Sequence, residues 1–161
     1  MNIRIGIGYD LHKLVAGREL FLGGVKIPFS KGLLGHSDAD VLLHAICDAV
    51  LGACGCADIG VHFPDTDTRF KGISGSELVQ ETCLIAKNKK EIKIINIDTV
   101  IICDQPNISA HRKAIAESIA GLLSISVERV NVKAKTTEET SKDTISSYAV
   151  VLLEVPKRIG D

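Results

Sequence analysis

Three side chains in this sequence have the types and the spacing of a metal site. Asp10 and His12 lie two residues apart near the end of a segment that alternates like a β-strand, so both project to the same side of an extended backbone. His44 adds a second imidazole. One oxygen ligand and two nitrogen ligands leave a fourth position open, as in catalytic rather than structural zinc sites. An isolated Asp-x-His pair is equally typical of a turn aspartate beside an exposed histidine, so the prediction of Zn²⁺ depends on His44 as the third ligand.

The residues just before His44 have the pattern of a helix start. Ser37 is predicted to cap the helix, with Asp40 reaching back from three residues later, and the helix is expected over 41–53. In this helix Asp40, His44 and Asp48 follow one another at intervals of four residues, opposite a broad apolar face. Either carboxylate is placed to hold the second nitrogen of His44. The alternative is a solvated histidine on a polar stripe.

The composition indicates a single folded domain over residues 1–161. Of the 161 residues, 45% are hydrophobic and 24% are charged, which are ordinary fractions for a soluble globular protein. Lys and Arg number 19 against 20 Asp and Glu, and 4% of the residues are aromatic. We expect no nucleic-acid partner, because phosphate-backbone binding requires a basic excess and single strands require aromatic stacking platforms.

The sequence also predicts a cytoplasmic protein. Strand-like alternation begins at Ile3, which leaves no room for a targeting peptide. The longest apolar region, 41–61, is amphipathic and is interrupted by His44, Asp48 and Asp58, so no membrane span is expected. The five cysteines are an odd number scattered through hydrophobic segments, and we interpret them as reduced, buried thiols.

The order of predicted elements indicates an α+β fold. Period-2 alternation and β-branched residues predict strands, while capping boxes and apolar stripes predict helices. The expected elements are a strand from residue 3, a hairpin at 19–22 and 25–28, a flexible approach at 31–35, helices at 41–53, 74–90 and 109–123, and strands at 92–103, 130–134 and 148–155. We predict a two-layer sandwich of a mixed β-sheet with helices packed on one face. The carboxylate-rich loop 58–67 is expected to carry function.

At these residues the chain resembles a known family. The matching segments, in order, are Gly-Tyr-Asp10-Leu-His12, Gly-Leu-Leu-Gly-His36-Ser-Asp-Ala-Asp40 through His44, Asp58-Ile-Gly60, Phe63-Pro-Asp-Thr-Asp67 and Asn131-Val-Lys-Ala-Lys-Thr-Thr-Glu138. Their order and spacing cover most of the chain and are similar to those of the 2-C-methyl-D-erythritol 2,4-cyclodiphosphate synthases, enzymes of the non-mevalonate isoprenoid pathway.

This resemblance implies a phosphorus–oxygen lyase that converts 4-diphosphocytidyl-2-C-methyl-D-erythritol 2-phosphate to 2-C-methyl-D-erythritol 2,4-cyclodiphosphate and releases CMP. The nucleophile belongs to the substrate, which explains why the sequence shows no Ser-His-Asp or Cys-His set. The family forms homotrimers with active sites between subunits. By the same resemblance, Glu138 binds Mg²⁺ or Mn²⁺ with the substrate phosphates, and Zn²⁺ is bound by Asp10, His12 and His44.

The resemblance also implies a role for each site residue. His36 and Thr136 stabilise the transition state. The methylerythritol phosphate side of the substrate is contacted by Asp10, His12, His36, Ser37, Asp58, Ile59, Gly60, Phe63, Pro64, Asp65, Thr66 and Asp67. The cytidine diphosphate side is contacted by Cys103, Asn107, Ile108, Ser109, Lys135, Thr136, Thr137 and Glu138.

Two departures from the family pattern qualify these expectations. Asn107 stands where the family usually has a lysine, so one phosphate contact is lost. The longer glycine-rich segment that follows Thr-Thr-Glu in the family is replaced here by 139–145, so binding of isoprenoid phosphates on the trimer axis is not carried over. The alternatives are a catalytically weak scaffold or sensor that binds zinc and nucleotide, and an unrelated metal-dependent phosphohydrolase.

Overall fold

The fold is built on a five-stranded mixed sheet, in a computed structural model that describes residues 2–35, 38–64, 66–70 and 72–156. The strands are β1 (Asn2–Ala16), β2 (Leu20–Leu22), β3 (Val25–Ile27), β4 (Lys31–Leu33), β5 (Lys93–Ile102), β6 (Val130–Lys135) and β7 (Thr144–Val155). The order in the sheet is β4-β1-β7-β5-β6, and each neighbouring pair is antiparallel except the parallel pair β5–β6. Strands β2 and β3 form a separate hairpin.

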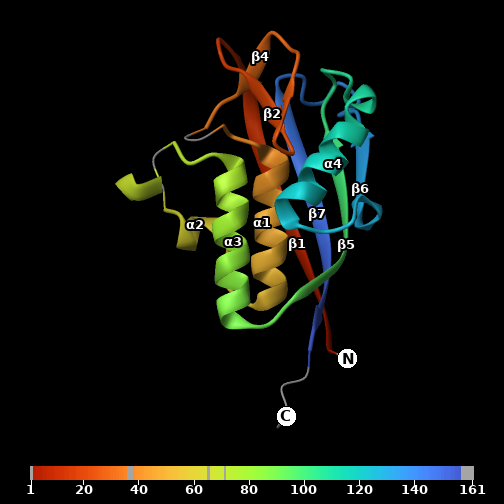
Figure 1. Cartoon of the computed structure of the whole chain (residues 1–161). Coiled ribbons are helices and arrows are strands. Elements are labelled where there is room, and N and C mark those ends of the chain that lie inside the picture. The colour runs from red at the N-terminus through yellow and green to blue at the C-terminus, as the bar shows by residue number, and fades with distance from the viewer. Residues whose placement is uncertain (1, 36–37, 65, 71, 157–161) are drawn as a thin grey trace.

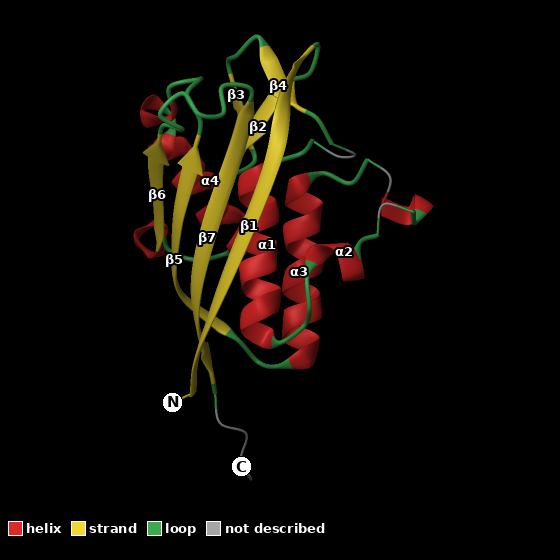
Figure 2. Ribbon diagram, turned by 180° about the vertical axis from the view of Figure 1, so that it is seen from behind, coloured by secondary structure: helices red, strands yellow, loops and turns green. Residues whose placement is uncertain are grey.

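The helices gather on one face of this sheet, as Figures 1 and 2 show from opposite sides. They are α1 (Val41–Cys54), α2 (Ile59–His62), α3 (Gly75–Lys89) and α4 (Arg112–Leu123), with 3-10 turns η1 (Thr68–Phe70), η2 (Ile108–Ala110) and η3 (Val127–Arg129). Helix α1 packs on β1 and β7, α3 packs on α1, and α4 packs on β6. The predicted two-layer α+β sandwich is therefore confirmed.

Two glycines let α1 lie directly on β1. Gly6 and Gly8 face the helix, and a β-carbon at either position would collide with the backbone carbonyl oxygen of Ala49 or of Ala45. The helix side of this contact is made of small residues one turn apart, Ala45, Ala49 and Ala53, all of them buried. The glycines of β1, and not the isoleucines between them, therefore form the inner side of the strand.

The outer face of the sheet is apolar and exposed over β1 and β7. Ile5 and Ile7 of β1 expose 69% and 66% of their surface. Val150 of β7 lies directly opposite Ile7 in the antiparallel ladder and is exposed as well. The rings of Tyr9 and Tyr148 pack on each other nearby, with centroids 4.5 Å apart. The alternation of β1 is as predicted, but its large apolar side chains lie on the side away from the helices.

Asp40 is the residue that starts α1. Its fully buried carboxylate accepts hydrogen bonds from the backbone N–H groups of Leu42 and Leu43 at 3.1 Å each, which satisfies the first turn of the helix. The same carboxylate accepts from Gly23 N at 2.9 Å and Gly24 N at 2.7 Å in the β2–β3 turn. The predicted capping box is therefore wrong, because Asp40 itself, and not the serine three residues earlier, is the N-cap residue.

Several elements begin or end at other residues than expected. β1 is 15 residues long, so Asp10 and His12 lie within the strand rather than at its end. The approach at 31–35 begins with strand β4, which pairs with β1. Helix α4 begins at Arg112, after η2, and β7 begins at Thr144, earlier than expected. These strand ends follow from pairing with distant segments, which local patterns do not show.

Helix α3 agrees with its prediction, and the cysteines are free as predicted, although Cys56 and Cys83 are only half-buried. The expected capping box is present: Ser74 Oγ accepts from Glu77 N at 3.2 Å, and Glu77 Oε2 accepts from Ser74 N at 2.9 Å. All five cysteines are free, and Cys47, Cys54 and Cys103 are buried. Burial raises the pKa of the Cys103 thiol to about 11, so it is un-ionised at neutral pH.

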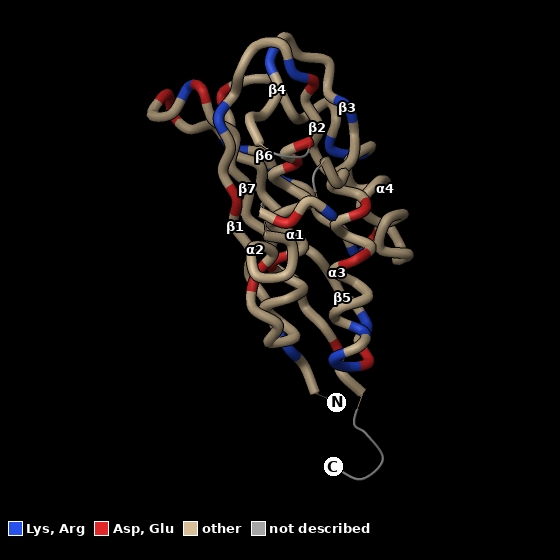
Figure 3. Tube along the Cα trace, turned by 90° about the vertical axis from the view of Figure 1, so that its left-hand side faces the viewer, with Lys and Arg blue, Asp and Glu red and all other residues tan. Residues whose placement is uncertain are grey.

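Charges of both signs are spread over the molecule. Figure 3 shows Lys and Arg interspersed with Asp and Glu along the trace. Within the described residues, no helix combines the length and the apolar character that crossing a bilayer requires.

Candidate metal and substrate site

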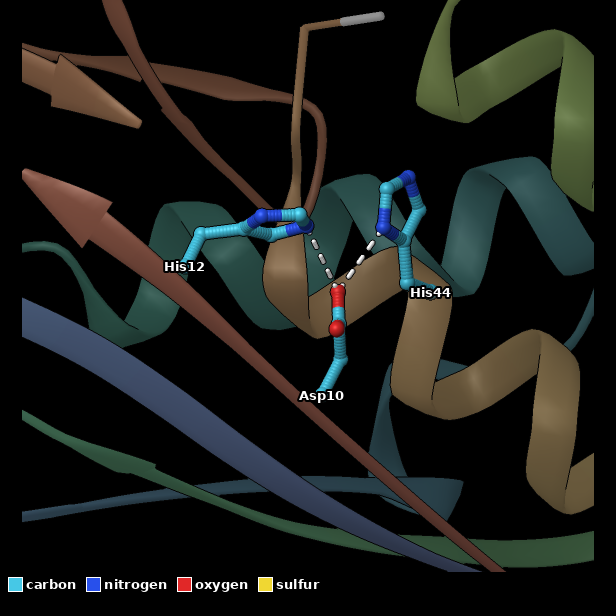
Figure 4. A group of neighbouring side chains, drawn as sticks. All are labelled: Asp10, His12 and His44. Atoms are coloured by element: carbon cyan, nitrogen blue, oxygen red, sulfur yellow. Dashed lines mark hydrogen bonds and ion pairs between the residues drawn. The ribbon is translucent and has the colours of Figure 1, made fainter. Parts of the chain in front are cut away.

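Asp10, His12 and His44 come together between the sheet and α1, as Figure 4 shows. Asp10 and His12 project from β1, and His44 projects from the first turn of α1. Asp10 Oδ2 lies 2.8 Å from His44 Nδ1 and 3.0 Å from His12 Nε2. The three ligand atoms that the residues offer all lie within 4.8 Å of one another. The grouping predicted from the sequence is confirmed, and it forms a possible metal site.

The donor atoms of this group fit a divalent cation. His12 Nε2 is buried and faces Asp10 Oδ2 at 3.0 Å, and His44 Nδ1 faces the same oxygen at 2.8 Å, so these donor atoms converge on one point that a metal could occupy. Burial by itself would raise the pKa of Asp10, but hydrogen bonds and charge interactions with His12 and His44 outweigh it and hold the pKa well below its usual value. An ionised carboxylate beside two imidazoles is a donor set typical of catalytic zinc.

The carboxylates expected to hold the ring of His44 have other partners. Both oxygens of Asp40 accept backbone N–H groups, and Asp48 Oδ1 accepts a hydrogen bond from Ile59 N at 2.8 Å. Within the described chain neither carboxylate is hydrogen-bonded to the imidazole, so the predicted contact is not formed. Burial lowers the pKa of His44, but the hydrogen bond and charge of Asp10, with smaller contributions from the more distant carboxylates, raise it overall.

Gly35 lies close to the group formed by Asp10, His12 and His44. A β-carbon at Gly35 would lie 2.7 Å from Ala39 Cβ and 3.3 Å from His12 Cε1, so only a glycine fits there without displacing a neighbour. Ala39 adopts a φ of 53°, which turns the backbone sharply into α1. His36 and Ser37, which the sequence assigns to catalysis and substrate binding, lie outside the described residues.

The predicted substrate loop begins beside α1. Asp48 binds Ile59 N, and Asp58 caps the short helix α2. Further along, the rings of Phe63 and Phe70 make an edge contact with centroids 5.2 Å apart. Of the loop residues predicted to contact the substrate, the structure describes Asp58, Ile59, Gly60, Phe63, Pro64, Thr66 and Asp67, and Asp65 lies outside the described residues. The loop is thus tied to the helix that carries His44.

A second group of predicted site residues gathers where β5 and β6 end. A hydrogen bond from Cys103 N to Lys135 O, 3.0 Å long, extends the parallel pairing of the two strands. Beyond it, Thr136 Oγ1 donates to Glu138 Oε1 at 2.6 Å. The adjoining turn after β5 carries Asn107, Ile108 and Ser109. The structure therefore brings together the residues predicted for the cytidine diphosphate side.

A cavity of about 660 Å³ opens beside Thr136 and Glu138. Its lining consists of Leu14, Phe29, Ser30, Lys31, Asp104, Gln105, Thr136, Glu138, Glu139, Lys142 and Asp143. The lining includes no member of the group formed by Asp10, His12 and His44. In the part of the chain that the structure describes, the two groups of predicted site residues therefore do not share this pocket.

Sequence reasoning does not identify every residue of this cavity. Lys31 and Asp143 form an ion pair at 2.9 Å although 112 residues separate them. Asp104 accepts hydrogen bonds from Thr137, 33 residues later, yet in the sequence it has the character of an ordinary turn residue. The one sequence signal for Asp104 is its place directly after a β-branched strand, where side chains at the end of β5 meet those at the end of β6.

Comparison with known proteins shows the family of this chain. The model of the YgbB family matches residues 3–154. The chain belongs to the YgbB family. The 2-C-methyl-D-erythritol 2,4-cyclodiphosphate synthase of Desulfosudis oleivorans is 57% identical over 136 residues, which cover 84% of this chain and 80% of that protein. The synthase of the same name from Fusobacterium nucleatum is 50% identical over 159 residues, 96% of this chain and 99% of that protein.

Solved structures place the fold in the same group. A 2C-methyl-D-erythritol-2,4-cyclodiphosphate synthase described as the CDP-bound form is 38% identical with a TM-score of 0.89, over 94% of this chain and 100% of that one. The bifunctional IspDF from Campylobacter jejuni is 36% identical with a TM-score of 0.91, over 97% of this chain and 43% of that one. The resemblance inferred from the motifs is confirmed as membership of the YgbB family.

Proposed function

We propose that the protein converts 4-diphosphocytidyl-2-C-methyl-D-erythritol 2-phosphate to 2-C-methyl-D-erythritol 2,4-cyclodiphosphate and CMP. The observation that carries the proposal is the open donor set of Asp10, His12 and His44 in a chain whose close relatives bear the name of this synthase. An oxygen of the substrate's 2-phosphate forms a bond to the β-phosphorus of the diphosphate. The bond from that phosphorus to the bridging oxygen breaks, and CMP leaves with the electron pair.

The protein has to align these groups and balance their charge, because the substrate supplies the nucleophile. His36 and Thr136 are assigned to stabilise the phosphoryl group in the transition state. Glu138 is assigned to Mg²⁺ or Mn²⁺ with the substrate phosphates. Zn²⁺ is assigned to Asp10, His12 and His44. When bound, the metals would supply positive charge to the phosphate oxygens of the substrate. The chain itself has a net charge of −1 and so has no excess of positive charge for this purpose.

The two groups of side chains correspond to the two ends of this substrate. The methylerythritol phosphate end is assigned to His36, Ser37 and the loop 58–67, whose Ile59 N is hydrogen-bonded to Asp48 of the helix that carries His44. The cytidine diphosphate end is assigned to 103–109 and 135–138, where the cavity beside Thr136 opens. The reaction makes the protein a phosphorus–oxygen lyase of the isoprenoid precursor pathway, and we expect it in the cytoplasm.

A complete site requires a second copy of the chain. One substrate has to reach both groups, and among the described residues of one chain the cavity beside Thr136 includes none of Asp10, His12 and His44. The exposed apolar side chains of β1 and β7, among them Ile5, Ile7 and Val150, form a surface that association would remove from water. We propose a homotrimer in which these sheet faces pack around a common axis and neighbouring subunits share each site.

The proposal is tested by following the reaction with phosphorus NMR. The zinc-loaded protein with Mg²⁺ should turn the cytidine diphosphate ester into a cyclic diphosphate and equimolar CMP, and a chelator should stop the reaction. Inorganic phosphate without a cyclic product would identify a phosphohydrolase instead. Tight CMP binding without any product would identify a binding protein.

A further inference from the structure

The turn that follows β6 has a strained backbone. Glu138 and Glu139 adopt φ values of 52° and 62°, in the left-handed region where a residue with a β-carbon is disfavoured. Two such residues in succession normally call for glycine or asparagine. Strained conformations of this kind persist where surrounding contacts hold them in place. This turn therefore depends on contacts with its surroundings.

Thr137, directly before Glu138 and Glu139, makes hydrogen bonds both within the turn and to a residue outside it. Within the turn, Thr140 N donates to Thr137 O at 3.1 Å, and Ser141 N donates to Thr137 Oγ1 at 3.2 Å. From outside the turn, Asp104 Oδ1 accepts from Thr137 N at 2.8 Å, and Asp104 Oδ2 accepts from the Thr137 hydroxyl at 2.7 Å. Asp104 follows β5, so its carboxylate ties the exit of one strand to the exit of its parallel neighbour.

The side chains on either side of Thr137 are those assigned to chemistry. The hydroxyl of Thr136 donates to the carboxylate of Glu138 at 2.6 Å, and both residues line the same cavity as Asp104. The direction of these two side chains depends on the backbone of the turn. A contact that fixes Thr137 therefore also fixes where the Thr136 hydroxyl and the Glu138 carboxylate point.

We propose that Asp104 is a positioning residue, whose two hydrogen bonds to Thr137 hold the strained turn so that Glu138 can bind a divalent cation together with the diphosphate. This inference rests on the function proposed above and adds to it the residue that sets the affinity of the second metal site. Asp104 is not itself assigned as a ligand, because each of its oxygens already accepts a hydrogen bond from Thr137. The hydrogen bond from the Thr137 hydroxyl lowers the pKa of Asp104, so the acceptor is ionised at neutral pH.

The test compares Asp104→Ala with Asp104→Asn in the zinc-loaded protein. Asparagine keeps the clamp, since its amide oxygen accepts from Thr137 N and its amide nitrogen donates to the Thr137 hydroxyl oxygen. Two quantities are measured: the Mn²⁺ concentration that gives half-maximal CMP release, and Mn²⁺ binding in the presence of CDP, followed by electron paramagnetic resonance. Glu117→Ala, which removes a carboxylate from the exposed side of α4, controls for the change in net charge.

We expect Asp104→Ala to raise both Mn²⁺ concentrations by about tenfold or more, as loss of an outer-sphere partner does at other metal sites. Asp104→Asn should stay within about threefold of the unaltered protein, and zinc content should be unchanged in both variants. Thr137→Val removes only the hydroxyl half of the clamp, so it should shift both concentrations in the same direction by less, and it decides the matter if Asp104→Ala fails to fold.

Three results would separate this inference from the proposed function. If Asp104→Ala and Thr137→Val bind Mn²⁺ with CDP as the unaltered protein does, the clamp has no role. If Asp104→Asn is as impaired as Asp104→Ala, the negative charge acts rather than the hydrogen bonds, which also overturns the inference. If the unaltered protein releases no CMP, the proposed function fails, while the binding measurement still tests the clamp.

Discussion

Asp10 binds both imidazoles of the metal group through one oxygen, Oδ2. Its other oxygen, Oδ1, accepts a hydrogen bond from Leu11 N at 2.8 Å. The carboxylate is thus oriented by its own backbone on one side and shared by His12 and His44 on the other. Because β1 supplies two residues of the group and α1 supplies the third, the group exists only while the helix stays in place on the strand.

Loss of His44 should empty the proposed zinc site. The variant His44→Ala leaves one carboxylate and one imidazole, so we expect zinc affinity to fall by more than the ~10–100-fold typical of losing an outer-sphere partner, and CMP release to fall with it. Zinc content after dialysis, measured by atomic absorption, checks the result. His111→Ala, at the N-terminal end of α4, is the matched control and should keep its zinc. Unchanged zinc content in His44→Ala would refute the assignment.

The metal group could be predicted from the sequence because its pattern is local. Asp10 and His12 share one side of a strand by the period of two, and His44 follows a recognisable helix start. The contact of Asp104 with Thr137 could not be predicted in this way, since it depends on the parallel pairing of β5 with β6. The fold places these two residues together, and no pattern in the sequence links one to the other.

At the scale of elements, the side of β1 that contacts α1 could not be predicted from the sequence. The alternation of isoleucine and glycine predicts a strand, but it does not show which side meets the helix. A large apolar side chain normally faces the core, whereas here Gly6 and Gly8 do so because the helix approaches too closely for any β-carbon. Asp40 is a similar case: the helix start was predictable, and its bonds to the β2–β3 turn were not.

Substitution of the inner glycine should therefore be costly. In Gly8→Ala the new β-carbon would meet the carbonyl oxygen of Ala45, so α1 must move away from β1. We expect the free energy of unfolding to fall by about 1–3 kcal/mol or more, as in other overpacked cores, and zinc affinity to fall because His44 moves with the helix. Urea denaturation and zinc content measure the two effects.

Gly121→Ala is the matched control for this substitution. Gly121 lies in helix α4, and a β-carbon added there would meet no atom within 4 Å beyond its chain neighbours and the backbone of its own helix. Alanine should therefore stabilise the protein by about 0.5–1 kcal/mol. A Gly8→Ala variant as stable as the unaltered protein would contradict the packing argument.

At the scale of the whole molecule, the sheet has one face covered by helices and one face left bare. The sandwich class could be predicted from the order of elements, because strands and helices are separated by clear turn signals. That class already implies one bare face, but it does not show that Ile5, Ile7 and Tyr148 lie on it, which becomes visible only when β1 is paired with β7. From sequence alone, a trimer is implied by the family resemblance and not by any local pattern.

A charge on this face should break the proposed trimer. Ile7→Asp places a carboxylate where association would bury it, and an unpaired buried charge is strongly unfavourable. We expect sedimentation velocity to show monomers, with a loss of CMP release of about tenfold or more because each site loses its second subunit. Ile7 is 66% exposed in the single chain, so the subunit itself should still fold.

Leu84→Asp is the control, because Leu84 is also exposed but lies on α3, away from the outer face of the sheet. It should sediment like the unaltered protein. Trimers that persist in Ile7→Asp would show that the subunits associate through another surface.

The antiparallel pairing of β1 with β7 also brings the start of β1 next to the end of β7. Asn2 is opposite Val155 in the ladder, and both lie at the pole away from the β2–β4 region, as the N and C labels in Figures 1 and 2 show. Asp10 and Glu138 lie further along toward the other pole. An addition at either end of this strand pair would therefore lie at the pole opposite to these predicted site residues.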